Sequence, residues 1–455
     1  MSENTEKQQW GSAFGFIVSS IGYAVGVGAI WKFPYMMGMN GGGIFLLLCI
    51  IFAIIIAIPL CWAELTLGRY TQKSVIACYK DLNAGGIWSL ISWMGLATVI
   101  ILISYYITIV SDVMFYIFKY LSGGLSKMGI DELGDYYWNL QLNMPYKWVT
   151  VLILYAATIV VILGGVQKGL ERANKILIPG LFIFLCILAI RGLMLPGAGE
   201  GLKFVFQPNA ESMAAAGGFF KVAMGALNQC FFLAGVGMAT LYSFGSYLDR
   251  ENSDIPFSGS VIILSNIVVA ILAGVAIFPA LFTYNMDVAG GSGLVFKTLP
   301  YVFTEMAGGR LWGTLFFLLL FAAGWSSVLG LFEGAASTMA DGFGSTRNKA
   351  VAIVTIICIV LGALTIHAFT QLENVTPLGM DFFTFMDFVA MLITLPIGVI
   401  IMSIFVATKW WDKFIEHSSV GAKYFKIPHV LKGWYLVVLP VITAVVVIMG
   451  IRSYF

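Results

Sequence analysis

Long apolar segments constrain this chain more than any other feature. An apolar run of about 20 residues is enough to span a bilayer. Of the 455 residues, 60% are hydrophobic and only 11% are charged, whereas a soluble chain has about 25% charged residues. The sequence therefore predicts an all-α polytopic membrane protein that uses residues 1–455 as one domain. Its eleven predicted spans lie at about 12–37, 42–66, 88–120, 147–166, 174–196, 216–249, 256–284, 310–340, 350–369, 381–408 and 431–451.

Lysine and arginine predict the orientation, because cytoplasmic loops carry an excess of both. With the N-terminus inside, the inner face receives 15 of the 25 basic residues. Eleven spans then put the C-terminus outside a plasma membrane. The formal charge of +2 is too small to indicate a nucleic-acid partner. The inner-face residues are Lys7, Arg69, Lys73, Lys80, Lys168, Arg172, Lys175, Arg250, Arg347, Lys349, Lys409, Lys413, Lys423, Lys426 and Lys432.

Residues that commonly carry enzyme chemistry show no useful pattern. The six cysteines lack paired spacing, and the three histidines are too scattered for a metal site. Neither a phosphate-binding glycine loop nor a nucleophile elbow is found. We therefore do not expect an enzyme.

Two glycine pairs interrupt spans that lie five apart in the sequence. Gly26-Val27-Gly28 lies in the first span, and Gly235-Val236-Gly237 lies in the sixth. An odd offset means that the second copy enters the membrane from the opposite side. We interpret residues of about 12–196 and 214–408 as an inverted repeat, with 431–451 as an added helix. Glycine-interrupted spans in equivalent positions indicate a transporter site at the membrane midplane, although small residues also serve close helix packing.

A broken helix supplies the chemistry of such a site. The interrupted backbone exposes carbonyls, which can bind a cation, and amides, which can bind a carboxylate. Glycine lets a ligand approach the backbone because it has no Cβ.

The chain resembles the neurotransmitter:sodium symporter family, in the eleven-span branch that includes bacterial leucine and hydrophobic amino acid transporters. The matching segments are GYAVGVGAIWKFPYMMGMNGGG (22–43), IPLCWAELTLGRY (58–70), GVQKGLERANKILIP (165–179), NQCFF (228–232) and AAGWSS (322–327). The resemblance implies ten spans arranged as two inverted fives, broken helices 1 and 6, and sodium-coupled import of a small amino acid-like substrate by alternating access.

The resemblance also implies a sodium site, which corresponds to the second site of the family. Its expected ligands are the carbonyls of Gly22, Val25 and Ala323 and the hydroxyls of Ser326 and Ser327. Hard cations prefer such oxygen ligands.

The first sodium site of the family is degraded in this sequence. Ala29 and Leu233 stand where relatives have oxygen-bearing side chains, and only Asn266 is retained. We therefore expect one intact sodium site.

The substrate is expected between the two breaks. Tyr106 matches the tyrosine that binds a carboxylate in relatives, with the amides of Val27 and Gly28 beside it. Gly26 stands where monoamine transporters have an aspartate, which favours an amino acid. Gly235 is expected to leave room for an apolar or aromatic side chain. The other predicted pocket residues are Tyr23, Ala24, Leu102, Phe232, Met238, Ser327 and Leu331.

Ionisable residues within the spans are candidates for function, and the resemblance implies two gates. Lys32 with Asp387, or with Asp381 as the alternative, would form the outer gate. Trp10, Asp341 and Tyr247, together with Lys7, would form the inner latch.

Three further expectations concern single residues and rival functions. Glu64 and Glu333 are interpreted as buried structural carboxylates, and no chloride site is assigned because Ala270 replaces a polar group. A transporter of another amine or zwitterion, a ligand-sensing membrane protein and a channel remain open alternatives. The oligomeric state is also open.

Overall fold

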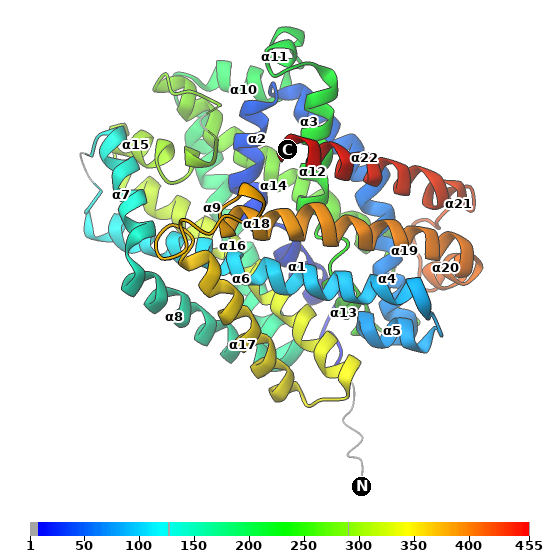
Figure 1. Ribbon diagram of the computed structural model, residues 1–455. Helices are drawn as coiled ribbons and strands as arrows, with labels where there is room; N and C mark the ends of the chain where they lie inside the picture. Colours follow the sequence, from blue (N-terminus) through cyan, green and yellow to red (C-terminus); the bar gives the residue numbers. More distant parts are fainter. Residues whose placement is uncertain (1–7, 126–127, 290, 455) are drawn as a thin grey trace.

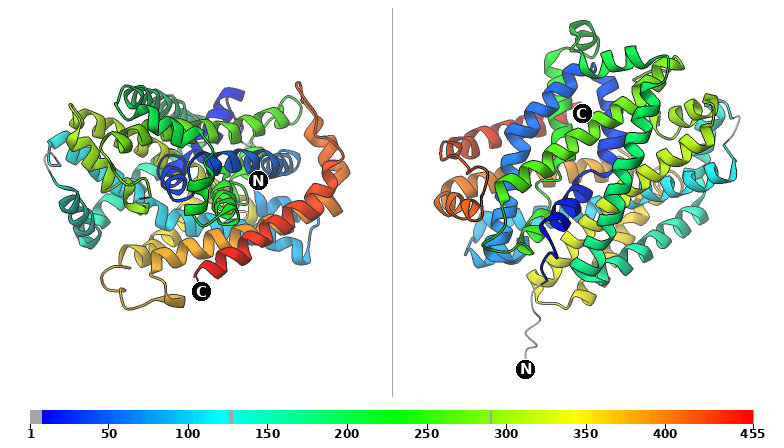
Figure 2. Two further views of the ribbon diagram at one scale, coloured as in Figure 1. Left: turned by 90° about the horizontal axis from the view of Figure 1, so that it is seen from above. Right: turned by 180° about the vertical axis from the view of Figure 1, so that it is seen from behind.

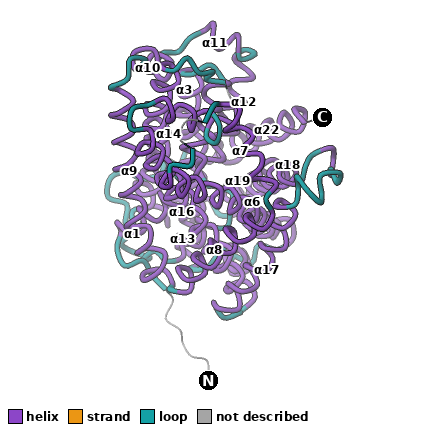
Figure 3. Tube along the Cα trace, turned by 90° about the vertical axis from the view of Figure 1, so that its left-hand side faces the viewer, coloured by secondary structure: helices purple, strands orange, loops and turns teal. Residues whose placement is uncertain are grey.

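The fold is a bundle of helices in a computed structural model of the chain, which describes residues 8–125, 128–289 and 291–454. These residues form helices and loops without a β-strand (Figures 1 and 3). Lys7, predicted in the inner latch, lies outside the described residues.

Nine unbroken spans are long and apolar enough to cross a membrane within the described part of the chain. Some contain π-helical or 3₁₀ turns between shorter α-helices. They are Gly43–Thr71, with α3 (Gly43–Phe52) and α4 (Ile58–Thr71); Gly86–Ser122, with α6 (Ser89–Ser122); α8 (Met144–Leu163); Val166–Leu193, with α9 (Arg172–Leu193); α14 (Ile255–Thr283); α16 (Gly309–Phe343); α17 (Arg347–Ile366); Phe382–Lys409, with α18 (Phe382–Phe388) and α19 (Leu395–Lys409); and Leu431–Arg452, with α21 (Leu431–Gly433) and the start of α22 (Leu439–Tyr454).

The first and sixth spans are broken, as predicted. In the first, α1 (Ala13–Ala24) and the helix Gly28–Met39, which ends in α2 (Phe33–Met39), are bent by 53°. The sixth consists of α12 (Phe219–Ala234) and α13 (Thr240–Ser246). Adding these two broken spans to the nine unbroken ones gives eleven. The limits of the two repeats remain predictions.

Short helices cover the two ends of the bundle. At one end lie α7 (Ile130–Leu142), α10 (Ala198–Phe206), α11 (Ala210–Ala215) and α15 (Thr298–Glu305) (Figure 1). At the other end lie α5 (Val75–Asp81) and α20 (Trp411–Ser419).

The broken helices occupy the centre of the bundle. α1 packs against α9, α13, α14 and α16, and every residue from Val18 to Ala24 is buried. By contrast, α22 lies along the outer edge beside α19 (Figure 2), which fits its interpretation as an addition to the repeats.

Candidate functional site

The two helix breaks require glycine for different physical reasons. At the sixth span, Gly235 and Gly237 adopt φ values of 60° and 80°, a left-handed conformation that side chains disfavour. At the first span, glycine is required because side chains of other helices approach the backbone closely. A Cβ on Gly26 would lie 2.6 Å from the Tyr106 hydroxyl oxygen, and one on Gly28 would lie 2.1 Å from the Phe232 ring.

A small cavity of about 30 Å³ lies between the two breaks. It has room for about two or three water molecules, since a water needs roughly 10–15 Å³ measured in this way. A larger ligand would therefore require the wall to move. The lining contains every predicted pocket residue except Val27, and also Leu233: Tyr23, Ala24, Gly26, Gly28, Leu102, Tyr106, Phe232, Leu233, Gly235, Met238, Ser327 and Leu331.

Tyr106 contacts the broken first span directly. Its hydroxyl oxygen accepts a hydrogen bond of 2.6 Å from the backbone N–H of Val27. The Val27 amide, expected to bind substrate, is thus already paired with Tyr106. Because the oxygen acts here as an acceptor, the Tyr106 O–H remains a potential donor to a carboxylate.

Gln229 was not singled out by its sequence position, although it is buried beside the first break. Its side-chain amide donates to the Gly28 carbonyl at 3.3 Å. The signal that could have indicated this role is a polar side chain within the otherwise apolar sixth span.

The space beside Gly235 is already filled, contrary to expectation. A Cβ on Gly235 would lie 2.8 Å from Cε1 of Tyr23, and the Tyr23 hydroxyl donates to the Gly235 carbonyl at 2.6 Å. Gly235 therefore makes room for Tyr23, and the argument that it provides free space for a bulky substrate is wrong.

Oxygen atoms of the first and eighth spans gather next to the cavity, and Ser327 belongs to both the cluster and the cavity wall. The Ser326 hydroxyl donates to the carbonyls of Gly22 and Ala323, both at 2.9 Å. The Ser327 hydroxyl donates to Gly22 at 3.0 Å and to Tyr23 at 2.8 Å. Val25, the remaining expected ligand, is buried at the end of α1. Both serines are buried, so this oxygen set has the composition that suits a desolvated hard cation.

The residues of the expected first sodium site form no comparable cluster. Ala29 and Leu233 are buried and aliphatic. Asn266 donates to the Ile262 carbonyl of its own helix at 3.3 Å, and its side-chain oxygen has no partner in the described part of the chain. One side-chain oxygen is too few to replace the hydration shell of a cation.

The predicted outer-gate residues are engaged with aromatic neighbours. Lys32 Nζ lies 4.3 Å from the centre of the Phe232 ring, whereas Asp387 accepts a hydrogen bond of 2.7 Å from the Tyr105 hydroxyl. No ion pair within 4.0 Å joins Lys32 to Asp387, although the structure describes both. The expected direct charge pair is thus absent in this conformation. Asp381, the alternative, caps α18 by accepting from the Thr384 amide at 3.0 Å.

In the predicted inner latch, Trp10 joins the chain before α1 to the sixth span by hydrogen bonds. Its indole N–H donates to the Phe244 carbonyl at 3.0 Å, and its backbone N–H donates to the Tyr247 carbonyl at 3.2 Å. Asp341, the expected partner of Lys7, accepts from the Ser74 amide at 2.9 Å.

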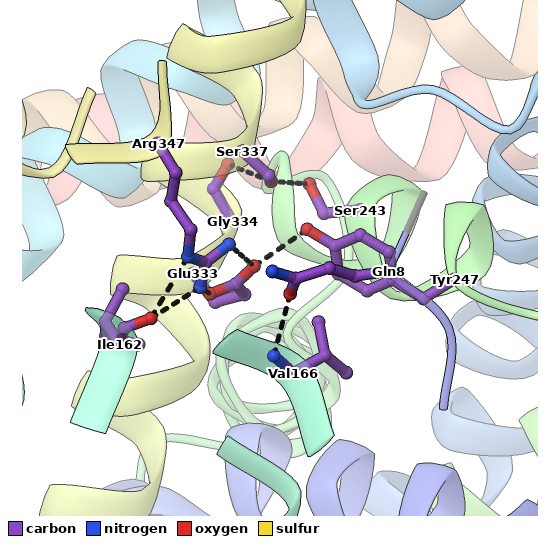
Figure 4. A network of polar contacts seen from close by, with 9 residues as sticks. All are labelled: Gln8, Ile162, Val166, Ser243, Tyr247, Glu333, Gly334, Ser337 and Arg347. Atoms are coloured by element: carbon purple, nitrogen blue, oxygen red, sulfur yellow. Dashed lines mark hydrogen bonds and ion pairs between the residues drawn. The ribbon is translucent and has the colours of Figure 1, made fainter. Parts of the chain in front are cut away.

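A buried polar network adjoins this latch (Figure 4). Arg347 forms two contacts with Glu333, of 3.0 and 2.5 Å, and the Tyr247 hydroxyl donates to the same carboxylate at 2.7 Å. Sequence reasoning identified Glu333 as a buried carboxylate but missed its partner Arg347. The sequence spacing of 14 residues does not predict this contact, because Glu333 lies on α16 and Arg347 on α17, and the pair forms only when the two helices pack together.

Two further carboxylates accept hydrogen bonds from the broken spans, Glu64 at the break of the sixth span and Glu171 just before α1 of the first. Glu64 accepts from the Gly237 amide at 2.5 Å, which agrees with its interpretation as a structural carboxylate. Glu171 accepts from the Gly11 amide at 2.8 Å and from the Ser12 hydroxyl at 3.2 Å. Glu171 was missed, although it lies within the matching segment 165–179.

Comparison with known proteins gives the family of the chain. The model of the sodium:neurotransmitter symporter family matches residues 7–131 and 127–455. The chain belongs to this family.

Relatives of this symporter cover almost its whole length. An uncharacterized sodium-dependent transporter, YhdH of Bacillus subtilis, is 33% identical over 88% of both chains. An uncharacterized sodium-dependent transporter of Haemophilus influenzae is 30% identical over all of both chains. The crystal structure of MhsT in complex with L-phenylalanine matches with a TM-score of 0.86 and 33% identity, covering 98% of this chain and 100% of that one. The symporter is therefore a multi-pass membrane transporter that depends on sodium, and not an enzyme.

Proposed function

We propose that this symporter imports an amino acid with an apolar or aromatic side chain, driven by a single sodium ion and working by alternating access. One observation carries the proposal: Tyr106 lines the cavity between the breaks, and the Val27 amide fixes its hydroxyl by donating a hydrogen bond of 2.6 Å to the hydroxyl oxygen. From this position its O–H could donate to a substrate carboxylate. The walls around it are mainly apolar, which favours an apolar side chain. The likeness to MhsT, whose crystal structure contains L-phenylalanine, supports the same class.

The residues present fit one sodium ion. The Ser326 and Ser327 hydroxyls, with the carbonyls of Gly22, Val25 and Ala323, would hold it. In place of their present hydrogen bonds to carbonyls, the two hydroxyls would turn their lone pairs toward the ion. The bound ion would neutralise the carbonyl dipoles and hold α1 against α16.

The gates are proposed on each side of this site. Lys32, with Phe232 beneath it and Asp387 nearby on α18, would close the outer side. Trp10, Tyr247, Asp341 and Lys7 would close the inner side. The distribution of basic residues supports an N-terminus inside the plasma membrane.

A substrate with a small side chain is the second candidate. It is favoured by the size of the cavity, about 30 Å³, and by the Tyr23 ring beside Gly235. The two candidates differ in whether Phe232, Met238 or Leu331 must move to admit the substrate.

Uptake into proteoliposomes tests the function. Purified protein should accumulate a labelled amino acid under an inward sodium gradient, and replacing sodium with potassium should abolish uptake. A competition series from glycine to phenylalanine then ranks side-chain size. Saturable binding without flux would indicate a ligand sensor, and flux that does not saturate would indicate a channel. Either result would contradict the proposed function.

A further inference from the structure

A cavity of about 860 Å³ lies away from the substrate site, at the end of the bundle that carries α5 and α20. Its walls come from the C-terminal end of α4, the loop between α5 and α6, the loop between α13 and α14, and the junction of α19 with α20. The proposed transport mechanism makes no use of it.

Three cations line this cavity: Arg250 from the loop between α13 and α14, and Lys409 and Lys413 from the junction of α19 with α20. Neither Arg250 nor Lys409 forms an ion pair with any residue that the structure describes. The carboxylate in the lining, Asp81, is paired with Lys73 at 2.8 Å. The cavity wall therefore carries excess positive charge.

Neither of the two carboxylates adjacent to Arg250 in sequence, Asp249 and Glu251, forms an ion pair with it. Asp249 accepts hydrogen bonds from the backbone amides of Glu251 at 2.9 Å and Asn252 at 2.7 Å. These two bonds hold the pKa of Asp249 below its usual value, so it stays ionised, but it does not form an ion pair with Arg250. The Arg250 guanidinium therefore has no carboxylate counter-charge among the described residues and can bind an anionic ligand.

Aromatic side chains complete the wall. Tyr70 and Trp410 pack edge to face with ring centres 5.3 Å apart, and Trp88 lines the cavity beside them. The indole N–H of Trp410 is buried and has no acceptor among the described residues. Tryptophan and tyrosine are enriched where a membrane meets water, because their rings are apolar and their N–H or O–H groups are polar.

Exposed apolar side chains lie next to this cavity, at the start of the span Gly86–Ser122 that contains α6. Ile87, Leu90 and Trp93 are 61%, 40% and 48% exposed, and Ile87 directly precedes Trp88. Such residues face lipid in a membrane-spanning helix. A ligand that occupied both features would need an anionic head and apolar chains.

We propose that this cavity binds the phosphate headgroup of an anionic phospholipid of the inner leaflet, with Arg250, Lys409 and Lys413 around the phosphate and the acyl chains along Ile87, Leu90 and Trp93. Basic pockets at the cytoplasmic side of membrane helices recognise such headgroups. The proposal rests on the orientation given under the proposed function, with the N-terminus inside, because the inner leaflet is the anionic one.

Native mass spectrometry of the full-length protein tests this site, with phosphatidylglycerol and phosphatidylcholine as probes. Arg250→Gln/Lys409→Gln/Lys413→Gln should bind phosphatidylglycerol at least about tenfold more weakly, with phosphatidylcholine binding unchanged. The matched control is Lys423→Gln/Lys426→Gln/Lys432→Gln, which removes the same charge from the predicted inner face without touching the cavity lining. The control should bind both lipids as the parent protein does.

Two results would overturn the proposal. An equal loss in the control would mean that overall charge, rather than this cavity, attracts the lipid. Full displacement of phosphatidylglycerol by inorganic phosphate would mean that the cavity binds free anions. If the triple variant does not fold, Lys413→Gln alone should still show a selective loss of phosphatidylglycerol, and an unchanged affinity would count against the site. Because the readout is lipid binding, it succeeds or fails independently of substrate and sodium coupling.

Discussion

The Tyr23 hydroxyl donates a 2.6 Å hydrogen bond to the Gly235 carbonyl, joining the broken first span to the broken sixth span across 212 residues of sequence. The same hydroxyl lies 3.4 Å from the Met238 sulfur. The bond satisfies a carbonyl that the helix break leaves free, and it places the Tyr23 ring beside Gly235. Tyr23 thus both holds the two breaks together and limits the cavity between them.

Tyr23→Phe should destabilise the protein, because it leaves the buried Gly235 carbonyl without a donor. We expect a loss of about 1–3 kcal/mol in the free energy of unfolding, measured as a lower melting temperature in detergent. Tyr155→Phe is the matched control, since the Tyr155 hydroxyl is buried without a hydrogen-bond partner among the described residues. The interpretation fails if the two variants melt alike.

Gly235→Ala should reduce uptake of small and large amino acids to the same degree. The new Cβ would lie 2.8 Å from the Tyr23 ring, and the backbone φ of 60° disfavours a side chain. Gly180→Ala is the control, because a Cβ there meets nothing within 4 Å. A selective loss of large substrates would instead mean that residue 235 faces the substrate rather than Tyr23.

Lys32→Ala should greatly reduce transport, whereas Lys32→Arg should retain it. The cation over the Phe232 ring contributes roughly 0.5–2 kcal/mol, and arginine can make the same contact. Uptake normalised to the amount of protein in the membrane measures the effect. Normal transport by Lys32→Ala would exclude the proposed outer gate.

Sodium coupling should depend on one site. Ser326→Ala and Ser327→Ala should each sharply raise the sodium concentration needed for half-maximal uptake, and Asn266→Ala should do so much less. Ser403→Ala is a suitable control, since its buried hydroxyl donates to the Ile400 carbonyl of its own helix.

The reversal potential gives the stoichiometry directly. One charge crossing 100 mV supplies about 2.3 kcal/mol and a tenfold sodium gradient about 1.4 kcal/mol, which limits accumulation of a zwitterion to about 500-fold. A measured ratio of two sodium ions per substrate would contradict the single-site proposal.

Arg347→Gln should destabilise the protein, because it leaves the fully buried Glu333 carboxylate with only the Tyr247 hydroxyl. Breaking a buried pair from one side typically costs about 3–5 kcal/mol, and Arg347→Gln/Glu333→Gln should recover part of the loss. Glu200→Gln, which removes an exposed pair with Lys203, should leave the melting temperature unchanged. Equal effects of Arg347→Gln and Glu200→Gln would show that the buried network does not contribute to stability.

The sequence alone determined the class of protein, the eleven spans and the two broken helices. Hydropathy over some 20 residues is a local property, and each glycine pair marks its own break without reference to the rest of the fold. The resemblance added the family and the residues around the cavity, because Tyr106, Phe232 and Ser327 lie in short matching segments.

Only the tertiary structure decided which of these residues touch. The sequence predicted free space beside Gly235, but Tyr23 fills it from a helix more than two hundred residues away. Lys32 and Asp387 carry opposite charges, yet in this conformation they form no ion pair within 4.0 Å: Lys32 lies over the Phe232 ring and Asp387 accepts from the Tyr105 hydroxyl. Glu333 pairs with Arg347 and Tyr247, and Arg250 lines one cavity with Lys409 and Lys413, which lie about 160 residues further along the chain. Residue types fix which contacts are chemically possible, whereas the packing of helices distant in sequence decides which of them form.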